Sequence, residues 1–181
     1  VLKPSEETPA TAMAIAAALQ DAGLPRGALN LVFGDPPTLS AHLVSSPLVR
    51  KLSFTGSVNV GKQLMRLAAG NLLRTTMELG GHAPVLVFGD ADIDAVAAAC
   101  AAAKFRNAGQ VCVSPTRFFV DEAVHDRFVE RFVAAAKQLR VGPGTHAETT
   151  MGPLTNARRI DAMEAFVSDS QMRGGQIRTG G

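Results

Sequence analysis

Short apolar segments alternate along the whole chain with longer segments of helical composition. The short segments predict strands at residues 29–33, 74–79, 84–88, 117–120 and 176–178, and a further strand within residues 48–55 that ends at Gly56. The longer segments predict helices at residues 8–22, 38–44, 57–69, 90–106, 122–139 and 156–168. Alternation of this kind is typical of an α/β fold with a largely parallel sheet, because parallel strands need a crossover, usually a helix, between them.

Local signals support several of these helices. Thr8 followed by Pro9 is a typical helix start, with a hydroxyl at the cap and proline at the first helical position. The segment 122–139 is amphipathic, and its Phe128 and Phe132 share one helix face.

Composition excludes several classes of protein. Lys and Arg number 18 and Asp and Glu 16, a net charge of +2 with no basic stripe, so no nucleic-acid partner is expected. No apolar stretch reaches the ~18 residues of a transmembrane helix, so no membrane partner is expected. The two cysteines, Cys100 and Cys112, are too few for a disulfide framework and fit a cytoplasmic protein. The four histidines show no ligand spacing, which predicts no metal site.

Neither end of the sequence has the features of a natural terminus. The chain begins with Val1 rather than Met, and it ends at Gly180 and Gly181 just after a predicted strand. No signal-peptide pattern is present. We therefore expect an internal piece of a longer protein.

A glycine-containing motif over residues 56–63, GSVNVGKQ, follows a predicted strand and opens a predicted helix. Backbone N–H groups at such a helix start can face a phosphate. The spacing fits part of a P-loop, but Gln63 stands where a Ser or Thr hydroxyl would bind magnesium. The G-x-G-x-x-G spacing of a dinucleotide fingerprint is also absent. By itself the motif is equally compatible with a turn that binds no ligand.

The two cysteines have different settings. Cys112 follows the sequence Asn107-Ala-Gly-Gln-Val in a loop, whereas Cys100 lies mid-helix among alanines. Cys100 is most simply a small core residue. Cys112 is a candidate nucleophile if its thiolate is exposed and stabilised, and an inert buried thiol otherwise.

A carboxylate marks the C-terminal end of the predicted strand at 74–79, where Glu78 stands just before Gly80 and Gly81. Ligands of α/β folds bind at this end of the strands. Burial there would raise a carboxyl pKa and suit a general base. The alternative is an exposed strand-end glutamate without a role in catalysis.

Together, these motifs resemble the aldehyde dehydrogenase superfamily. The matching segments are, in order, Lys3-Pro-Ser-Glu6, Phe54-Thr-Gly-Ser57 with Gly61, Glu78-Leu-Gly-Gly81, Gly109-Gln-Val-Cys112 and Met151-Gly-Pro-Leu154. The resemblance extends over essentially all 181 residues. It implies that residues 1–81 form the C-terminal part of a Rossmann-like, NAD(P)-binding domain, and that residues 82–181 begin the α/β catalytic domain that carries the nucleophile.

The resemblance also implies a role for each matching residue. Cys112 resembles the nucleophile that attacks the aldehyde carbonyl, and Glu78 resembles the base that activates water to hydrolyse the resulting thioester. The residues that resemble cofactor contacts are Lys3, Glu6, Gly56, Ser57, Gly61, Leu79 and Gly80. Glu6 would accept hydrogen bonds from ribose hydroxyls and repel a 2′-phosphate, which favours NAD, while Lys3 leaves NADP open. The alternative for this pair is a solvated ion pair before a helix.

One segment bears on the substrate. Residues 104–107, Lys-Phe-Arg-Asn, are similar to the succinate-semialdehyde dehydrogenase branch, in which an arginine at this place binds the substrate carboxylate. Bacterial enzymes for α-ketoglutaric semialdehyde share a similar stretch. Arg106 is therefore the candidate clamp for the carboxylate of a small-molecule semialdehyde, because a guanidinium donates two parallel hydrogen bonds. A cap on the C-terminus of the predicted helix is the alternative.

Other functional parts of the family lie outside this sequence. They are an upstream Asn that helps to hold the oxyanion, a downstream Glu-x-Phe segment that holds the nicotinamide ribose, and a C-terminal oligomerisation strand. We therefore expect little or no turnover from the 181-residue polypeptide alone, and a homo-oligomer, a dimer or tetramer, for the full-length protein. A catalytically inactive truncated relative stays open as an alternative, as does a P-loop-like protein, against which Gln63 argues.

Overall fold

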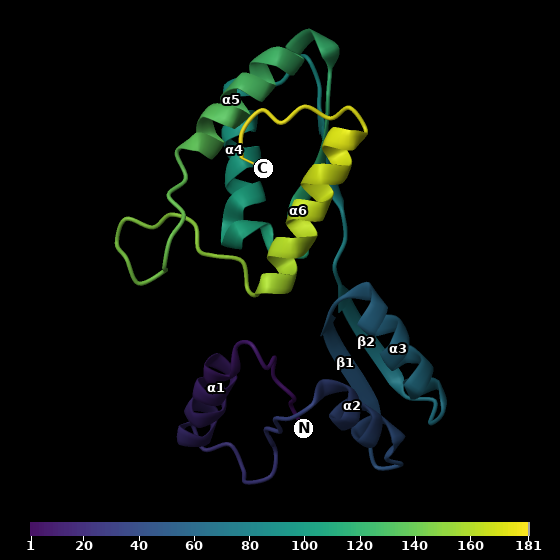
Figure 1. The fold of residues 1–181 in the computed structure, drawn as a ribbon. Coiled ribbons are helices and arrows are strands. Elements are labelled where there is room, and N and C mark those ends of the chain that lie inside the picture. Colours follow the sequence, from purple (N-terminus) through teal and green to yellow (C-terminus); the bar gives the residue numbers. More distant parts are fainter. Residues whose placement is uncertain (181) are drawn as a thin grey trace. The chain divides into compact units, whose positions relative to one another are not determined.

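The computed structural model describes residues 1–180, which form two compact units, unit 1 (Val1–Leu79) and unit 2 (from Gly80 onward) (Figure 1). The helices are α1 (Pro9–Asp21), α2 (Pro36–Ser45), α3 (Val58–Ala69), α4 (Ile93–Phe105), α5 (His125–Lys137) and α6 (Ala157–Met172), with short 3₁₀ helices η1 (Arg106–Gly109) and η2 (Glu122–Val124). The strands are β1 (Lys51–Gly56), β2 (Arg74–Leu79), β3 (Ala83–Val87) and β4 (Pro115–Val120).

Unit 1 is built around the parallel pair β1–β2. Their register runs from Lys51 opposite Arg74 to Gly56 opposite Leu79, and α3 connects the two strands and packs against both (Figure 1). Only Gly61, Leu64 and Ala68 are buried on α3, so a narrow apolar stripe holds the helix on the sheet. The C-terminal ends of both strands therefore lie at one edge, next to the start of α3.

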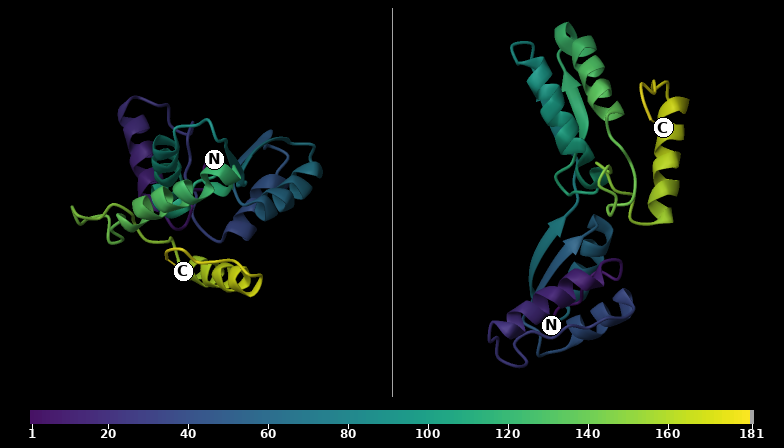
Figure 2. Two further views of the ribbon diagram at one scale, coloured as in Figure 1. Left: turned by 90° about the horizontal axis from the view of Figure 1, so that it is seen from above. Right: turned by 90° about the vertical axis from the view of Figure 1, so that its left-hand side faces the viewer.

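Unit 2 repeats this β-α-β arrangement with the parallel pair β3–β4 and the crossover helix α4. Helices α4 and α5 pack on each other, as the right-hand view of Figure 2 shows. The core beneath them consists of Val87, Ile93, Ala97, Cys100 and Phe128. The other side of the strands is uncovered by the described residues, since Leu86 and Phe119 are 62% and 53% exposed.

Charge and capping also fix the ends of the helices in unit 2. The Asp92 side chain accepts a hydrogen bond from the Ala95 N–H and so caps α4. Asp94 then pairs with Arg127 and Arg131 of α5 at 3.2 and 3.1 Å. The Arg127 guanidinium lowers the pKa of Asp94, but each of these groups is exposed, so packing of the apolar faces holds the two helices together.

The expected α/β class with parallel strand pairing is confirmed, but two expected strands are wrong. Residues 29–33 contribute only an isolated bridge between Leu31 and Leu2, and they are not buried. Residues 176–178 have no strand partner among the described residues. A strand is defined by its hydrogen-bonded neighbour, so a segment without such a neighbour stays irregular. The strand expected within residues 48–55 is confirmed as β1, which begins at Lys51 because residues 46–49 form turns.

Candidate active site

The loop between α4 and β4 carries Cys112 on an unusual backbone. Helix α4 ends at Phe105, and η1 then contains Asn107 and Ala108 with φ angles of 50° and 55°. Gly109 follows with φ 75°, so three successive residues are left-handed. This conformation costs a non-glycine residue about 1–2 kcal/mol, so the surrounding contacts must hold the loop.

Two local contacts brace this loop. Ser114 is only 4% exposed, and its hydroxyl donates to the Lys104 carbonyl at the end of α4, at 3.2 Å. The Asn107 and Gln110 side chains each donate to the other's backbone carbonyl, at 3.3 and 3.1 Å. The loop is therefore closed on itself and anchored to the helix that precedes it.

The two cysteines differ in accessibility as the sequence suggested. Cys100 is buried in the core of unit 2, and this burial raises the pKa of its thiol. Cys112 is exposed on its loop. A buried thiol with a raised pKa is a poor nucleophile, so Cys112 is the better candidate nucleophile of the two.

Arg106 stands at the junction of α4 and η1, six positions before Cys112. Its side chain is exposed and makes no hydrogen bond or ion pair within the described residues. The guanidinium therefore does not cap the carbonyls of α4 by hydrogen bonding. Its donors are available for an anionic ligand.

Glu78 lies at the end of β2, opposite Thr55 of β1. Its side chain is exposed, so the described residues do not bury the carboxylate in the way that would favour a general base. The carboxylate accepts no hydrogen bond from the described part of the chain. Glu78 belongs to unit 1 and Cys112 to unit 2.

The start of α3 provides anion-binding chemistry. The Ser57 hydroxyl caps the helix by accepting the Val60 N–H at 3.3 Å, and no acidic residue lies in the first turn. Residues 57–60 are exposed, so the positive end of the helix dipole faces away from the core. An exposed helix start of this kind can bind an anionic group.

The glycines near this helix have different neighbours. A Cβ at Gly61 would come within 2.8 Å of the Leu79 side chain, so Gly61 allows α3 to pack closely on β2. A Cβ at Gly56 would strike the Phe54 ring. Gly80 has open space around it. The close approach at Gly61 is thus to the chain's own Leu79, whereas Gly80, like Gly81, has open space within the described residues.

Lys3 and Glu6 lie together at the start of unit 1. The Lys3 ammonium is 3.3 Å from a Glu6 carboxylate oxygen and also donates to the Pro4 carbonyl at 2.6 Å. The Lys3 side chain is 24% exposed and that of Glu6 is 59% exposed. The Glu6 carboxylate partly neutralises the Lys3 charge, which weakens the attraction of Lys3 for an anionic group such as a phosphate.

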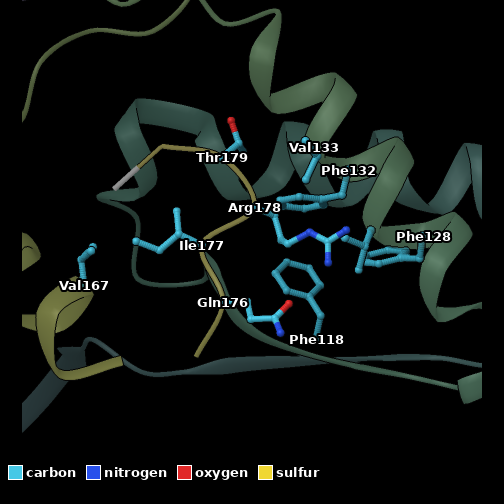
Figure 3. Close-up of a pocket in the computed structure, with 10 residues that line it drawn as sticks. Phe118, Phe128, Phe132, Val133, Val167, Gln176, Ile177, Arg178 and Thr179 are labelled. Carbon is cyan, nitrogen blue, oxygen red and sulfur yellow. The ribbon is translucent and has the colours of Figure 1, made fainter. Parts of the chain in front are cut away.

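Unit 2 has a hollow lined by residues of β4, α5, α6 and the segment after α6. It has a volume of about 350 Å³, and Figure 3 shows the Arg178 side chain among the rings of Phe118, Phe128 and Phe132. None of the candidate residues lines it. We therefore assign this hollow to packing rather than to chemistry.

The described residues hold no group of acidic, histidine or cysteine side chains that could bind a metal. Within the same residues, no helix is long and apolar enough to cross a membrane.

The model of the aldehyde dehydrogenase family matches residues 1–181. The chain belongs to the aldehyde dehydrogenase family. This membership accounts for the order of the sequence motifs and replaces the P-loop interpretation of residues 56–63.

Semialdehyde dehydrogenases are prominent among the relatives of this aldehyde dehydrogenase chain. It is 47% identical over 181 residues to a mitochondrial succinate-semialdehyde dehydrogenase of Arabidopsis thaliana, covering all of this chain and 34% of that protein. It is 42% identical to an NADP(+) succinate-semialdehyde dehydrogenase of Escherichia coli, covering 100% of this chain and 38% of that protein. The crystal structure of succinate-semialdehyde dehydrogenase from Burkholderia pseudomallei has a TM-score of 0.97 and 45% identity, over 100% of this chain and 38% of that one. The chain thus spans about a third of the length of these relatives.

One contact of the aldehyde dehydrogenase chain joins two loops that are far apart in the sequence. The Gln110 side chain bonds to residues 43 and 45 positions further along the chain, Pro153 and Thr155. The sequence marked both regions, as Gly109-Gln-Val-Cys112 and Met151-Gly-Pro-Leu154, but only as separate matches. No spacing rule connects two loops so far apart.

Proposed function

We propose that the protein containing this chain oxidises a carboxylate-bearing semialdehyde, such as succinic semialdehyde, to the acid with NAD(P). Unit 1 would belong to the cofactor domain and unit 2 to the catalytic domain. The observation that carries the proposal is Cys112, an exposed thiol on a strained, braced loop within a chain of the aldehyde dehydrogenase family. The alternative is a family member without activity, which an assay of aldehyde oxidation by the whole protein would distinguish.

The proposed chemistry begins at Cys112. Its thiolate adds to the aldehyde carbonyl carbon, and the carbonyl oxygen takes up the negative charge beside the Cys112 backbone N–H. Loss of hydride from the same carbon leaves an acyl thioester on Cys112. Glu78 then takes a proton from water as the water oxygen attacks the thioester carbon, and the Cys112 thiolate leaves with release of the acid.

Unit 1 would bind the cofactor, which supplies the hydride acceptor when bound. The exposed first turn of α3 and the Ser57 hydroxyl would hold the pyrophosphate. The open surface at Gly80, next to Leu79, would lie beneath the nicotinamide. Glu6 would accept hydrogen bonds from the adenosine ribose, with Lys3 beside it. We propose NAD as the preferred nucleotide, because the Glu6 carboxylate repels a 2′-phosphate.

Removing the Glu6 charge is expected to relax the nucleotide preference. With Glu6→Gln, kcat/KM for NADP relative to NAD should rise roughly tenfold, the equivalent of ~1.4 kcal/mol of repulsion. Steady-state kinetics with both nucleotides measure the ratio, and Glu7→Gln is the matched control because it removes one negative charge from the next position. A ratio that is the same in both variants and in the wild type would exclude Glu6 from nucleotide discrimination.

The Arg106 guanidinium would bind the substrate carboxylate. It is exposed, has no partner within the described residues, and lies on the same loop as Cys112. Relatives that act on succinic semialdehyde by name are consistent with a substrate that carries an anion. A carboxylate held by two parallel hydrogen bonds would fix the distance from the anion to the reacting carbonyl.

Replacing Arg106 tests the substrate class. In the whole protein, Arg106→Leu should lower kcat/KM for succinic semialdehyde roughly 100-fold while changing kcat/KM for uncharged propanal less than about threefold. NADH formation at 340 nm measures both, and Arg26→Leu, at an exposed arginine of unit 1, is the control. An equal loss for both aldehydes would contradict carboxylate binding by Arg106. A wild-type protein that oxidises neither aldehyde would contradict the proposed function itself.

A further inference from the structure

The Gln110 side chain uses its whole hydrogen-bonding capacity between two loops of unit 2. Its Nε2 donates to the Asn107 carbonyl at 3.1 Å and to the Pro153 carbonyl at 3.4 Å. Its Oε1 accepts the Thr155 backbone N–H at 2.9 Å and the Thr155 hydroxyl at 2.7 Å. An amide that donates twice and accepts twice is fully satisfied, and neither a carboxylate nor a shorter amide can replace it.

The segment that receives Gln110 is itself well anchored. Arg140 and Gly142, which follow α5, bond to the residues just before it: Gly142 N–H to the Met151 carbonyl at 3.1 Å, and Arg140 N–H to the Thr150 hydroxyl at 2.8 Å. Thr150 N–H returns a bond to the Arg140 carbonyl at 2.9 Å. Gln110 therefore bonds to a segment whose preceding residues are themselves hydrogen-bonded to the chain after α5.

The loop on the other side of Gln110 is the one that needs support. Asn107 and Ala108 have left-handed backbones without being glycine, and Cys112 follows two positions after Gln110. Strained backbone persists only where surrounding contacts determine it. The Gln110 amide supplies the contacts to Pro153 and Thr155, which lie outside this loop.

We propose that Gln110 is a positioning residue, which locks the Cys112 loop onto residues 153–155 and so fixes the thiol and the Cys112 backbone N–H for attack on the substrate carbonyl. Gln110 acts through the loop and does not itself touch the reacting atoms. The inference rests on the proposed function, since it assigns Gln110 to the reaction of Cys112. It also gives the Met151-Gly-Pro-Leu154 motif a role, as the support for the catalytic loop.

The hydrogen bonds of Gln110 to Pro153 and Thr155 form the Gln110 clamp. Variants of Gln110 and of Thr155 distinguish a role in positioning Cys112 from a role in general stability. Gln110→Ala removes all four bonds, and Gln110→Glu keeps the two acceptors but places a carboxylate against the Asn107 and Pro153 carbonyls. Thr155→Val removes the hydroxyl bond alone while preserving side-chain shape and the backbone bond. Thr155→Ser retains both bonds. Gln171→Ala, at an exposed position of α6, is the control for loss of a glutamine.

The measurement is kcat per Cys112 thiol titrated in the whole protein, with the KM for NAD determined in parallel. We expect kcat per thiol to fall roughly 10- to 100-fold in both Gln110 variants and several-fold in Thr155→Val, because small displacements of reacting groups are costly. Thr155→Ser and Gln171→Ala should stay within about twofold of wild type, and the KM for NAD should not change. A merely structural role would lower the number of titratable thiols but leave kcat per thiol unchanged.

Two results have different meanings. If the wild-type protein is active through Cys112, but Gln110→Ala and Thr155→Val keep wild-type kcat per thiol, the positioning role is wrong and the proposed function stands. If the wild-type protein lacks the activity, or keeps it in Cys112→Ala, the proposed function fails. In that case, amide hydrogen exchange over residues 107–112 still tests whether Gln110 holds the loop. Exchange should accelerate in Gln110→Ala and not in Gln171→Ala.

Discussion

Cys112→Ala is expected to reduce aldehyde oxidation by at least about 10⁴-fold, because without the thiolate no covalent acyl intermediate can form. The loop should fold as before, since the exposed Cys112 side chain contributes nothing to the core of unit 2. Binding of NAD should also be retained, because Cys112 is not one of the proposed dinucleotide contacts. Steady-state assays of the whole protein with succinic semialdehyde measure the loss, and dye-monitored thermal unfolding checks that the fold is intact.

Cys100→Ala is the matched control for this prediction. Cys100 is buried in the core, so its replacement should lower the stability slightly and leave kcat near the wild-type value. Alkylation by iodoacetamide at neutral pH should also modify Cys112 much faster than Cys100, whose pKa is raised by burial. Retained turnover in Cys112→Ala, or loss of turnover in Cys100→Ala at wild-type levels of folded protein, would contradict the assignment of the nucleophile.

Glu78→Gln is expected to stop the reaction after the thioester has formed. The neutral amide cannot take the proton from water, so steady-state kcat should fall roughly 10²- to 10⁴-fold. Formation of the thioester does not require this proton transfer, so a rapid burst of about one NADH per active site should remain. Stopped-flow absorbance at 340 nm resolves the burst from the slow turnover that follows.

An exposed glutamate elsewhere provides the control for Glu78. Glu164→Gln on α6 removes the same charge at an exposed position of unit 2 and should leave both the burst and the turnover unchanged. If Glu78→Gln abolishes the burst together with turnover, Glu78 acts before the thioester forms, and the assignment as the base for hydrolysis is wrong. Unchanged turnover would exclude it from the reaction.

Much of the fold could be predicted from local sequence because its signals are local. The strand predicted at 74–79 is β2 with the same bounds, and the helix predicted at 57–69 is α3, which begins one residue later because Ser57 caps it. Apolar period and capping side chains act within a few residues, so a single sequence contains them. The parallel pairing of β1 with β2 follows from the helix between them.

Features that depend on distant partners could not be predicted. The segment at 176–178 was expected to form a short strand, but a strand needs a hydrogen-bonded neighbour, which no local pattern reveals. The close contact of Gly61 with Leu79 of the next strand is also invisible in the local sequence, which marks Gly61 only as a residue that resembles a cofactor contact. The hydrogen bonds between Gln110 and Thr155 join positions 45 residues apart. Asn107 and Ala108 have left-handed backbones but are not glycines, so their sequence does not indicate this conformation. Each of these results from tertiary contacts that override local preference.

The most direct test of the account is to identify the covalent intermediate. The whole protein with Glu78→Gln, mixed with succinic semialdehyde and NAD and quenched in acid during the burst, should carry a succinyl group on Cys112. Peptide mass spectrometry locates this group, and omission of NAD should abolish it. A succinyl group on Cys112 that depends on NAD is the predicted result. An unmodified Cys112 in a sample that has produced a full burst of NADH would contradict the claim that the thiol of Cys112 carries the reaction.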